Sequence, residues 1–488
     1  MKRLHRAALL AWPLALGWTS EASAHAFAQR YDLPLPLWYY LAGAGAAVAL
    51  SFVAAAAVLN PRRARVFEQR IDVGRSPLWR ALAAPSFAGA IGVVSVALFL
   101  VLLGAGFLGP QGEPESNLLV VTVWVLWWVG LTYVCALAGD AWRTINPLAI
   151  LARWASALWM RAAGHAPRPL LALPERVGIW PACILFLAFA WAELVWPQNA
   201  VPPKLACAMV GYALVSWAGM AVFGIETWLR RGEALSVFFA LIGRFAPLDP
   251  QAAQLRHYGA GLIARGPLSP SETAFVVVVL ATVSFDGIKE TPLWNEIAAR
   301  AAGLLYASGM LGAIGNVAGE ALVKSVGLLA MPLAFGLLYL GICRIGAALL
   351  GAEAGRSWSA ATFARLFVLS LVPIAIGYHL AHYLSYLLIH GQAAIALASD
   401  PFGLGWNLFG TRGFEPDIAI IGARFVWSAC VIAIVLGHVA AVLVAHVIAL
   451  HAFGDRRLVL RSQYPMLALM VAYTMLSLWI LSQPIVKS

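Results

Sequence analysis

Stretches of about twenty apolar residues recur along this chain, and charged residues are nearly absent from them. An α-helix needs about 20 residues to cross the ~30 Å hydrocarbon layer of a membrane, where it satisfies its own backbone hydrogen bonds. The sequence therefore predicts an all-α fold, a polytopic bundle of about ten transmembrane helices. The predicted spans are residues 36–59, 88–108, 117–140, 177–196, 205–224, 272–288, 324–351, 363–390, 418–452 and 464–484.

The composition excludes a soluble protein of several domains, which a length of 488 residues would otherwise suggest. Hydrophobic residues make up 62% and charged residues 11%, whereas soluble chains carry about 25% charged residues. The lipid bilayer is therefore the expected partner. The net charge of +11 comes from short basic loops without a basic domain, so we predict no nucleic-acid partner. The sequence has no P-loop, serine- or zinc-hydrolase motif and no Cys-x-x-Cys pair, which argues against an enzyme without excluding one.

Residues 1–24 have the pattern of a secretory signal peptide. Basic residues precede an apolar stretch over residues 7–18, and small residues at 22–24 form a cleavage pattern. Cleavage would leave residues 25–488 as a single transmembrane domain that begins at His25. An α-amine and an imidazole on one residue can chelate copper. The alternatives are that His25 merely follows the cut, or that the signal stays attached as an anchor.

Ten spans after a cleaved signal place both chain termini on the same, outer side of the membrane. The loop charges agree, because the five predicted inner loops hold 20 Lys and Arg residues and the outer segments hold 6. Short loops rich in Lys and Arg stay on the cytoplasmic side. We therefore predict a protein of the inner (cytoplasmic) membrane of a bacterium-like cell, with periplasmic or extracellular termini.

Residues 301–319 are apolar enough to suggest an eleventh span. A further span would reverse every later loop and place the arginines at 456, 457 and 461 outside. A re-entrant or surface helix keeps the charge pattern intact. The five glycines of the segment favour close backbone packing at membrane depth, and the alternative is an amphipathic helix on the outer surface.

Histidines occur inside two consecutive predicted spans. His379 and His382 are three residues apart and share a helix face, and the next span carries His438 and, about two turns later, His446. Ionisable residues in the membrane interior are costly and are usually functional. We infer three alternatives for them: an intramembrane path for metal ions or protons, ligation of haem b, or a structural role. In the structural alternative the histidines bond to the neighbouring Tyr378, Tyr383 or Tyr386.

A second cluster of candidate residues lies at the predicted outer end of the sixth span. Asp286 and Glu290 are four residues apart and share a face if the helix continues that far. Together with His390 and a mature His25 they offer ligands for copper or another transition metal. The alternative is a helix end closed by an ion pair between Asp286 and Lys289.

Three weaker features lie near predicted membrane boundaries. Asp140 closes a span at the inner side and is expected to pair with Arg143. Glu193 lies near the outer end of its span and is a candidate lining residue. Residues 226–245, in a long inner loop, place Trp and Phe beside Arg, which is typical of a helix in the headgroup region.

Five stretches along the chain carry a family resemblance: HAFAQRYDLPLPLWYYLAGAGAAVALSF, INPLAIL, LPERVGIWPA, SFDGIKETPLW and YHLAHYLSYLLIHGQ. Through them the chain resembles an uncharacterised family of prokaryotic polytopic membrane proteins, over most of its length. The resemblance implies the membrane architecture. It implies no substrate and no functional residue.

The sequence favours a transporter or permease-like protein that moves a metal cation or protons along the histidine path. One alternative is a membrane redox subunit that binds haem b or a quinone between the two His-bearing spans. Another is a structural or assembly subunit of a membrane complex, in which the histidines only pack. The first hypothesis rests on the buried histidines and on the lack of a soluble catalytic domain.

Overall fold

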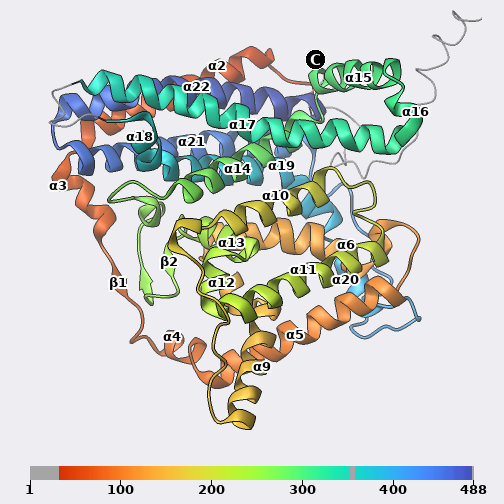
Figure 1. Ribbon diagram of the computed structural model, residues 1–488. Coiled ribbons are helices and arrows are strands. Elements are labelled where there is room, and N and C mark those ends of the chain that lie inside the picture. Colours follow the sequence, from red (N-terminus) through yellow and green to blue (C-terminus); the bar gives the residue numbers. More distant parts are fainter. Residues whose placement is uncertain (1–31, 352–357, 486–488) are drawn as a thin grey trace, which may run out of the picture.

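The computed structural model describes residues 32–351 and 358–485, and nearly all of this chain is helical (Figure 1). Ten helical segments of the described residues are long and apolar enough to cross a membrane. This confirms the predicted all-α bundle of ten spans, and the chain is an integral membrane protein. The predicted signal peptide and His25 lie outside the described residues. The ten segments are α2 (Leu37–Val58), α5 (Pro85–Leu108), α6 (Leu118–Val121) with η4 (Thr122–Leu131) and α7 (Thr132–Leu137), η5 (Glu175–Val177) with α10 (Trp180–Leu194), α11 (Pro202–Phe223), α14 (Pro270–Ile288), α17 (Asn316–Leu350), α18 (Ala360–Phe367) with η8 (Val368–Leu371) and α19 (Val372–His390), α21 (Ala423–Phe453) and α22 (Arg456–Ile485).

Most helix ends lie within a few residues of the predicted span ends. The largest differences are α17, which begins at residue 316 where the span is predicted from 324, and α22, which begins at 456 where 464 is predicted. Hydropathy locates the part of a helix that lies in hydrocarbon, whereas backbone hydrogen bonds continue through polar turns beyond it. The shorter elements are α3 (Pro61–Ala64), η2 (Arg65–Glu68), α4 (Pro77–Leu82), η3 (Pro114–Ser116), α8 (Trp142–Ile145), α9 (Pro147–Ala163), α12 (Ile225–Arg231), α13 (Ala234–Gly243), η6 (Ala260–Leu262), α15 (Pro292–Ala307), α16 (Met310–Ile314) and α20 (Ala393–Ser399).

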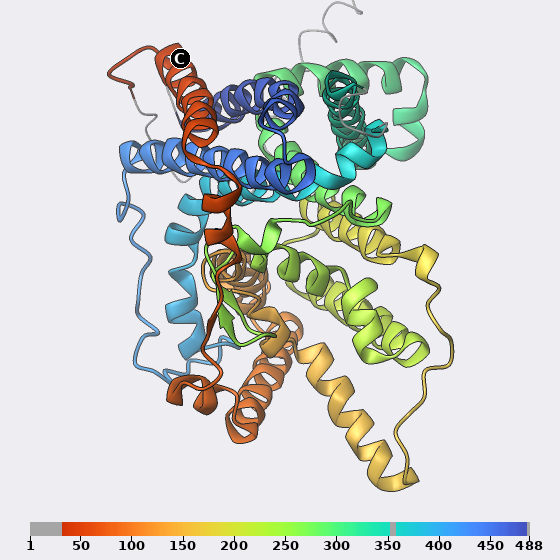
Figure 2. The same ribbon diagram turned by 90° about the vertical axis from the view of Figure 1, so that its left-hand side faces the viewer.

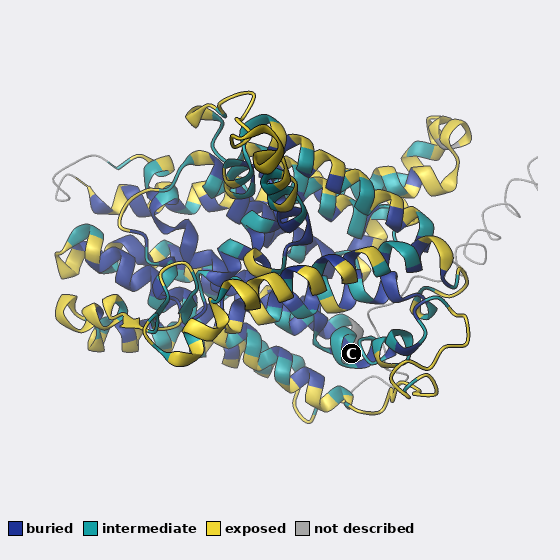
Figure 3. Ribbon diagram, turned by 90° about the horizontal axis from the view of Figure 1, so that it is seen from below, coloured by how far each residue is buried: buried dark blue, intermediate teal, exposed yellow. Residues whose placement is uncertain are grey.

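The spans form two groups that pack side by side (Figures 1 and 2). The six-helix group contains α2, α14, α17, α18–α19, α21 and α22, and the four-helix group contains α5, α6–η4–α7, α10 and α11. The two groups meet where α10 and η4 pack against α14 and α19. Buried residues gather in the middle of the bundle and exposed ones on its periphery (Figure 3). By the predicted topology, α14 begins at the cytoplasmic end of the bundle. In the sense of that prediction, we call this end the inner end and the opposite end the outer end.

Two glycines bring the His-bearing helices α19 and α21 into backbone contact. A Cβ atom on Gly377 would lie 2.7 Å from the carbonyl oxygen of Ala433, and one on Gly437 would lie 2.7 Å from the carbonyl oxygen of Pro373. Small residues allow membrane helices to approach this closely. The two His-bearing spans are therefore neighbours, as their order in the chain suggests.

A short helix of the inner loop between α11 and α14 enters the bundle. The prediction that residues 226–245 form a helix in the headgroup region is wrong for α13, which packs against α7 and α10. Its Phe238 ring lies 5.0 Å from the ring of Trp128, and its Phe239 ring lies 5.7 Å from that of Trp127. Both phenylalanines are buried, so α13 belongs to the core.

A buried carboxylate satisfies the hydrogen-bond donors at the start of the inserted helix α13. Glu233 is 0% exposed and accepts the first backbone N–H groups of α13, from Leu235 at 3.0 Å and from Ser236 at 2.8 Å. Tyr212 of α11 donates its hydroxyl to the same carboxylate. The free N–H groups of a helix start, which would be costly in a membrane, are thereby satisfied.

The inner end also carries a small antiparallel sheet and a projecting helix. The strands β1 (Ile71–Asp72), β3 (Gln254–Leu255) and β2 (Leu248–Asp249) lie in the order β1-β3-β2, with Leu255 opposite both Ile71 and Leu248. The sheet joins the loop after α2 to the loop before α14. Helix α9 begins behind the side-chain cap of Asn146 and extends away from the bundle (Figure 2).

The ambiguous segment 301–319 forms no single helix in the structure. It is divided among the end of α15, the short α16 and the first turn of α17. A Cβ atom on Gly303, Gly309, Gly312 or Gly315 would meet no atom within 4 Å. The expected close backbone packing is therefore absent at these four glycines. Gly309 lies between α15 and α16 and Gly315 between α16 and α17, and these helical pieces lie at the outer end of the bundle (Figure 1).

Substitution of Gly377 by Ala is expected to destabilise the protein, because the new methyl group would lie 2.7 Å from a backbone oxygen of α21. Overpacking of a well-packed interior typically costs about 1–3 kcal/mol. The matched control is Gly341→Ala in α17, where the added methyl group would meet no atom within 4 Å. SDS-induced unfolding in mixed micelles measures both free energies. An equal effect of the two substitutions would contradict the close crossing.

Candidate functional site

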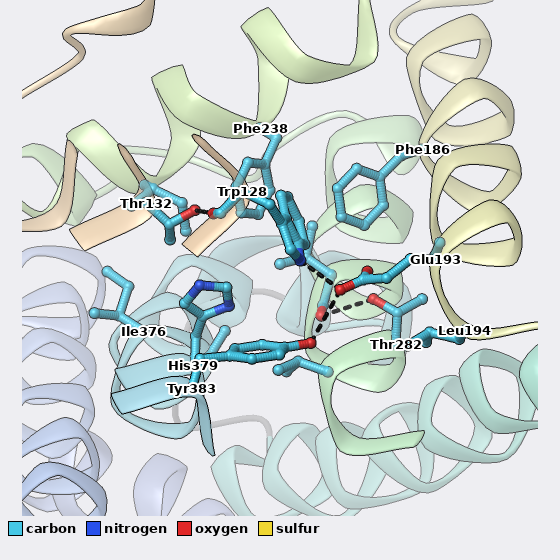
Figure 4. A pocket seen from close by; sticks show the side chains of 15 residues that line it. Trp128, Thr132, Phe186, Glu193, Leu194, Phe238, Thr282, Ile376, His379 and Tyr383 are labelled. Carbon is cyan, nitrogen blue, oxygen red and sulfur yellow. Dashed lines mark hydrogen bonds between the residues drawn. The ribbon is translucent and has the colours of Figure 1, made fainter. Parts of the chain in front are cut away.

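Ionisable side chains from both helix groups meet in the outer half of the bundle. Tyr383 of α19 donates its hydroxyl to Asp286 Oδ2 of α14, and the same oxygen atom of Tyr383 lies 3.1 Å from Glu193 Oε1 of α10. The indole N–H of Trp128 in η4 donates to Glu193 Oε1 at 2.5 Å (Figure 4). Asp286, Tyr383 and Glu193 form a chain of contacts that we call the buried relay. It crosses the contact between the two groups.

The chemistry of the Tyr383 hydroxyl makes the buried relay sensitive to one proton. A hydroxyl carries a single proton and can donate it to only one acceptor at a time. Asp286 and Glu193 both approach the Tyr383 oxygen atom within hydrogen-bond distance. The two contacts are therefore both hydrogen bonds only when one of the carboxylates also carries a proton. This geometry is a candidate proton-binding site.

Two further side chains bind Asp286, whose own side chain is buried. His382 Nε2 lies 2.9 Å from Asp286 Oδ2, and Lys289 Nζ lies 3.1 Å from Asp286 Oδ1. Burial alone would lower the pKa of Lys289. The nearby carboxylates of Asp286 and Glu290 have the larger, opposite effect and hold this pKa above its usual range. A buried carboxylate is tolerated only when it is paired and hydrogen-bonded in this way. The ion pair between Asp286 and Lys289, the alternative drawn from the sequence, is present.

His379 lies one turn before Tyr383 and lines a narrow cavity beside the relay. Its ring centroid is 4.7 Å from that of Tyr383 and 5.6 Å from that of Trp128. The cavity measures about 20 Å³, which is room for about one water molecule, and Glu193 lines it too (Figure 4). The Nε2 atom of His379 is buried and makes no hydrogen bond with the described residues. It is thus available to a molecule in the cavity.

A π-helix sets the position of Trp128. The ten residues of η4 form this wider helix within an otherwise α-helical span. Long π-helical stretches are rare, and short ones frequently occur at functional sites. The altered winding changes which side chains face α10 and α19. Sequence analysis missed Trp128, because hydropathy carries no signal that separates a π-helix from an α-helix.

The two predicted histidines of α21 do not join those of α19. His438 donates its Nδ1–H to the carbonyl oxygen of Ile434 at 2.9 Å, and its ring lies 5.8 Å from that of Tyr473 in α22. His446 Nδ1 lies 3.3 Å from Gln463 Oε1, also in α22. The glycine contact between α19 and α21 leaves these imidazoles on the side of α22. The expected path through all four histidines is therefore not continuous.

The predicted outer metal cluster is not assembled among the described residues. His390 pairs with Glu115 at 2.8 Å, while Asp286 binds His382 and Lys289 instead. Glu290 Oε1 lies 3.8 Å from Lys289 Nζ. Within the part of the chain that the structure describes, no group of three or more His, Cys, Asp or Glu side chains could hold a metal ion.

Asp140 lies at the other end of the bundle, away from the buried relay. It accepts the backbone N–H of Arg143 at 3.2 Å, and burial raises the pKa of its carboxyl to about 6. It lines a larger cavity of about 290 Å³ at the inner end, which we call the inner vestibule. The charged residues of the inner vestibule are Asp140, Arg143, Arg153, Glu226, Arg230, Arg244 and Glu272.

Comparisons with known proteins add no relative from which a function could be transferred. No protein-family model, no curated protein and no solved structure matches this chain. The resemblance to prokaryotic polytopic membrane proteins stays a prediction. The interpretation of the buried relay therefore rests on its geometry.

Substitution of Asp286 by Asn is expected to destabilise the protein by about 1–3 kcal/mol, because it removes the buried carboxylate that binds Lys289 and accepts the Tyr383 hydroxyl. The matched control is Glu320→Gln, which breaks the exposed ion pair with Lys324 and should cost less than about 1 kcal/mol. Both free energies are measured by SDS-induced unfolding in mixed micelles. Losses of the same size would show that the buried pairing has no special weight.

Proposed function

We propose that this integral membrane protein is a transporter that moves protons across the membrane, with the buried relay as its proton-binding site. One observation carries the proposal: a single tyrosine hydroxyl bridges the buried carboxylate of Asp286 and the half-buried carboxylate of Glu193 at the contact between the two helix groups. Ionisable groups at this depth are typical of proton relays in pumps and transporters. Movement of one group against the other would change the relay and hence its proton affinity.

The cavity beside His379 and the inner vestibule support a proton path that α13 closes between them. Helix α13 lies between them, because its Phe238 and Ile242 line the cavity beside His379 whereas its Val237 and Leu241 line the inner vestibule. The ring of Phe238 stacks on that of Phe186 at 5.3 Å and adds to a hydrophobic barrier. Displacement of α13 would join the inner vestibule to the relay. A water molecule beside His379 would extend the relay toward α13.

Protons suit this site better than the metal cation that the sequence also favours. The described residues offer no group that could hold a metal ion, and the carboxylate of Asp286 is already taken by His382 and Lys289. The redox alternative needs a haem or quinone between α19 and α21. Those helices touch through their backbones at Gly377 and Gly437, which leaves no gap for a macrocycle at that level.

The third alternative, a structural or assembly subunit, makes a different prediction for the same residues. If the relay only held the two helix groups together, its substitution would lower stability and leave ion flux unaffected. A flux measurement on folded variants therefore separates the two functions. By the predicted orientation, the half of the bundle that contains the relay is the one nearer to the periplasm.

Protons should cross the membrane of vesicles that contain the purified protein faster than they cross the membrane of protein-free vesicles. We expect a potassium diffusion potential, set with valinomycin, to acidify vesicles loaded with a pH-sensitive dye. Glu193→Gln and His382→Gln should reduce acidification to the protein-free rate, because each removes a titratable group at the relay. The exposed His165→Gln is the matched control and should retain the native rate.

Each variant must first elute as a folded species, as judged by size-exclusion chromatography and thermal unfolding. Native rates in folded Glu193→Gln and His382→Gln would overturn the proposal. Native protein that acidifies vesicles no faster than the protein-free control would do the same.

A further inference from the structure

The inner vestibule collects arginines from four different elements. Arg143 comes from α8, Arg153 from α9, Arg230 from α12, and Arg244 follows the last residue of α13. Elements so far apart in sequence would repel one another through these side chains if nothing compensated the charge. The cavity, at about 290 Å³, is also far larger than the one beside His379.

The carboxylates of the inner vestibule compensate only part of this positive charge. Glu226 pairs with Arg153 at 2.8 Å, and Glu272 is used in the capping box with Ser269 at the start of α14. Asp140 accepts the backbone N–H of Arg143, and this hydrogen bond uses part of the capacity of its carboxylate to bind the arginine side chains. Of the four guanidinium groups, only that of Arg153 is paired with a carboxylate, that of Glu226, while Glu272 already accepts hydrogen bonds from Ser269.

Three of the guanidinium groups keep free donors. Arg230 and Arg244 each use Nε to bind a backbone carbonyl, of Glu226 at 3.1 Å and of Gly261 at 3.0 Å. Arg143 uses only its backbone N–H in the hydrogen bonds of the described residues. No carboxylate of the described chain lies within ion-pair distance of these three side chains. Their terminal N–H groups can therefore bind an anion.

We infer that the inner vestibule binds a small organic phosphate. A guanidinium presents a planar fork of donors that matches two oxygen atoms of a phosphate or carboxylate. A carboxylate has two oxygens and is filled by one fork, whereas a phosphate group has enough oxygens to accept several. Part of the remaining wall is apolar, with Leu229, Val237, Leu241 and Val276, and suits an organic substituent on the phosphate.

The phosphate group can come from two sources with the same chemistry. A soluble phosphate ester would enter from the cytoplasmic side, and an anionic phospholipid would offer its headgroup at the level of the inner loops. The inference is independent of the proton path, because it requires only the cavity and its arginines. Loss of proton flux would leave it intact, and loss of phosphate binding would leave the proton path intact.

Isothermal titration calorimetry on the full chain, in detergent at low salt, tests the inference. Inorganic phosphate and glycerol 3-phosphate are the soluble probes, and phosphatidic acid in nanodiscs is the lipid probe, with acetate as the carboxylate control. Arg143→Gln should weaken phosphate binding about tenfold, because it removes a charge-assisted hydrogen bond. Asp140→Asn should strengthen it, because it removes a negative charge from the cavity. Arg161→Gln, on the exposed end of α9, should leave it unchanged.

Weaker phosphate binding by Arg143→Gln together with stronger binding by Asp140→Asn is a pattern of opposite effects. It separates binding in the inner vestibule from a general loss of fold, which would weaken binding in both variants. Binding of glycerol 3-phosphate with this pattern assigns a soluble ester, and the same pattern with phosphatidic acid alone assigns a lipid headgroup. Either result supports the inference. It is overturned if no phosphate probe binds the folded protein, if acetate binds as tightly as phosphate, or if Arg143→Gln binds like the native chain.

Discussion

A carboxylate inside a membrane protein must be paired, and the pairing of Asp286 organises the outer half of this bundle. Lys289 forms an ion pair with it and His382 binds it from α19, and these contacts bring the outer end of α14 against the middle of α19. Tyr383 then extends the pairing to Glu193 on the four-helix group. The two groups are thus joined through ionisable residues, in addition to the apolar packing that holds each group together. A contact of this kind can respond to a proton, whereas a purely apolar contact cannot.

Glycine contacts and buried caps supply the geometry that this pairing needs. The backbone contact at Gly377 fixes α19 against α21 and turns the relay side of α19 toward α10 and α14. At the inner end, Glu233 allows α13 to lie among the spans and to separate the inner vestibule from the cavity beside His379. The same short helix therefore borders both of the proposed sites.

The architecture was predictable from the sequence because hydropathy is a local property. Asp286 and His382 are also recognisable, since ionisable residues inside apolar spans are conspicuous. Their contact was not, because it depends on how two non-consecutive helices are rotated. His438 is equally conspicuous yet faces Tyr473, and Glu193, a weak candidate in the sequence, lies in the relay. The insertion of α13 depends on its packing against α7 and α10 and on the hydrogen bond from Tyr212 to its cap Glu233, which no local pattern reports.

The central claim is that Tyr383 couples Asp286 to Glu193 across the two helix groups. A double-mutant cycle of Asp286→Asn and Glu193→Gln, measured by SDS-induced unfolding, tests it most directly. Residues that share a hydrogen-bond network typically couple by about 0.5–3 kcal/mol. The account predicts coupling in this range, and its loss when the cycle is repeated in a Tyr383→Phe background. Additive effects in the native background, or coupling that survives without the hydroxyl, would contradict the account.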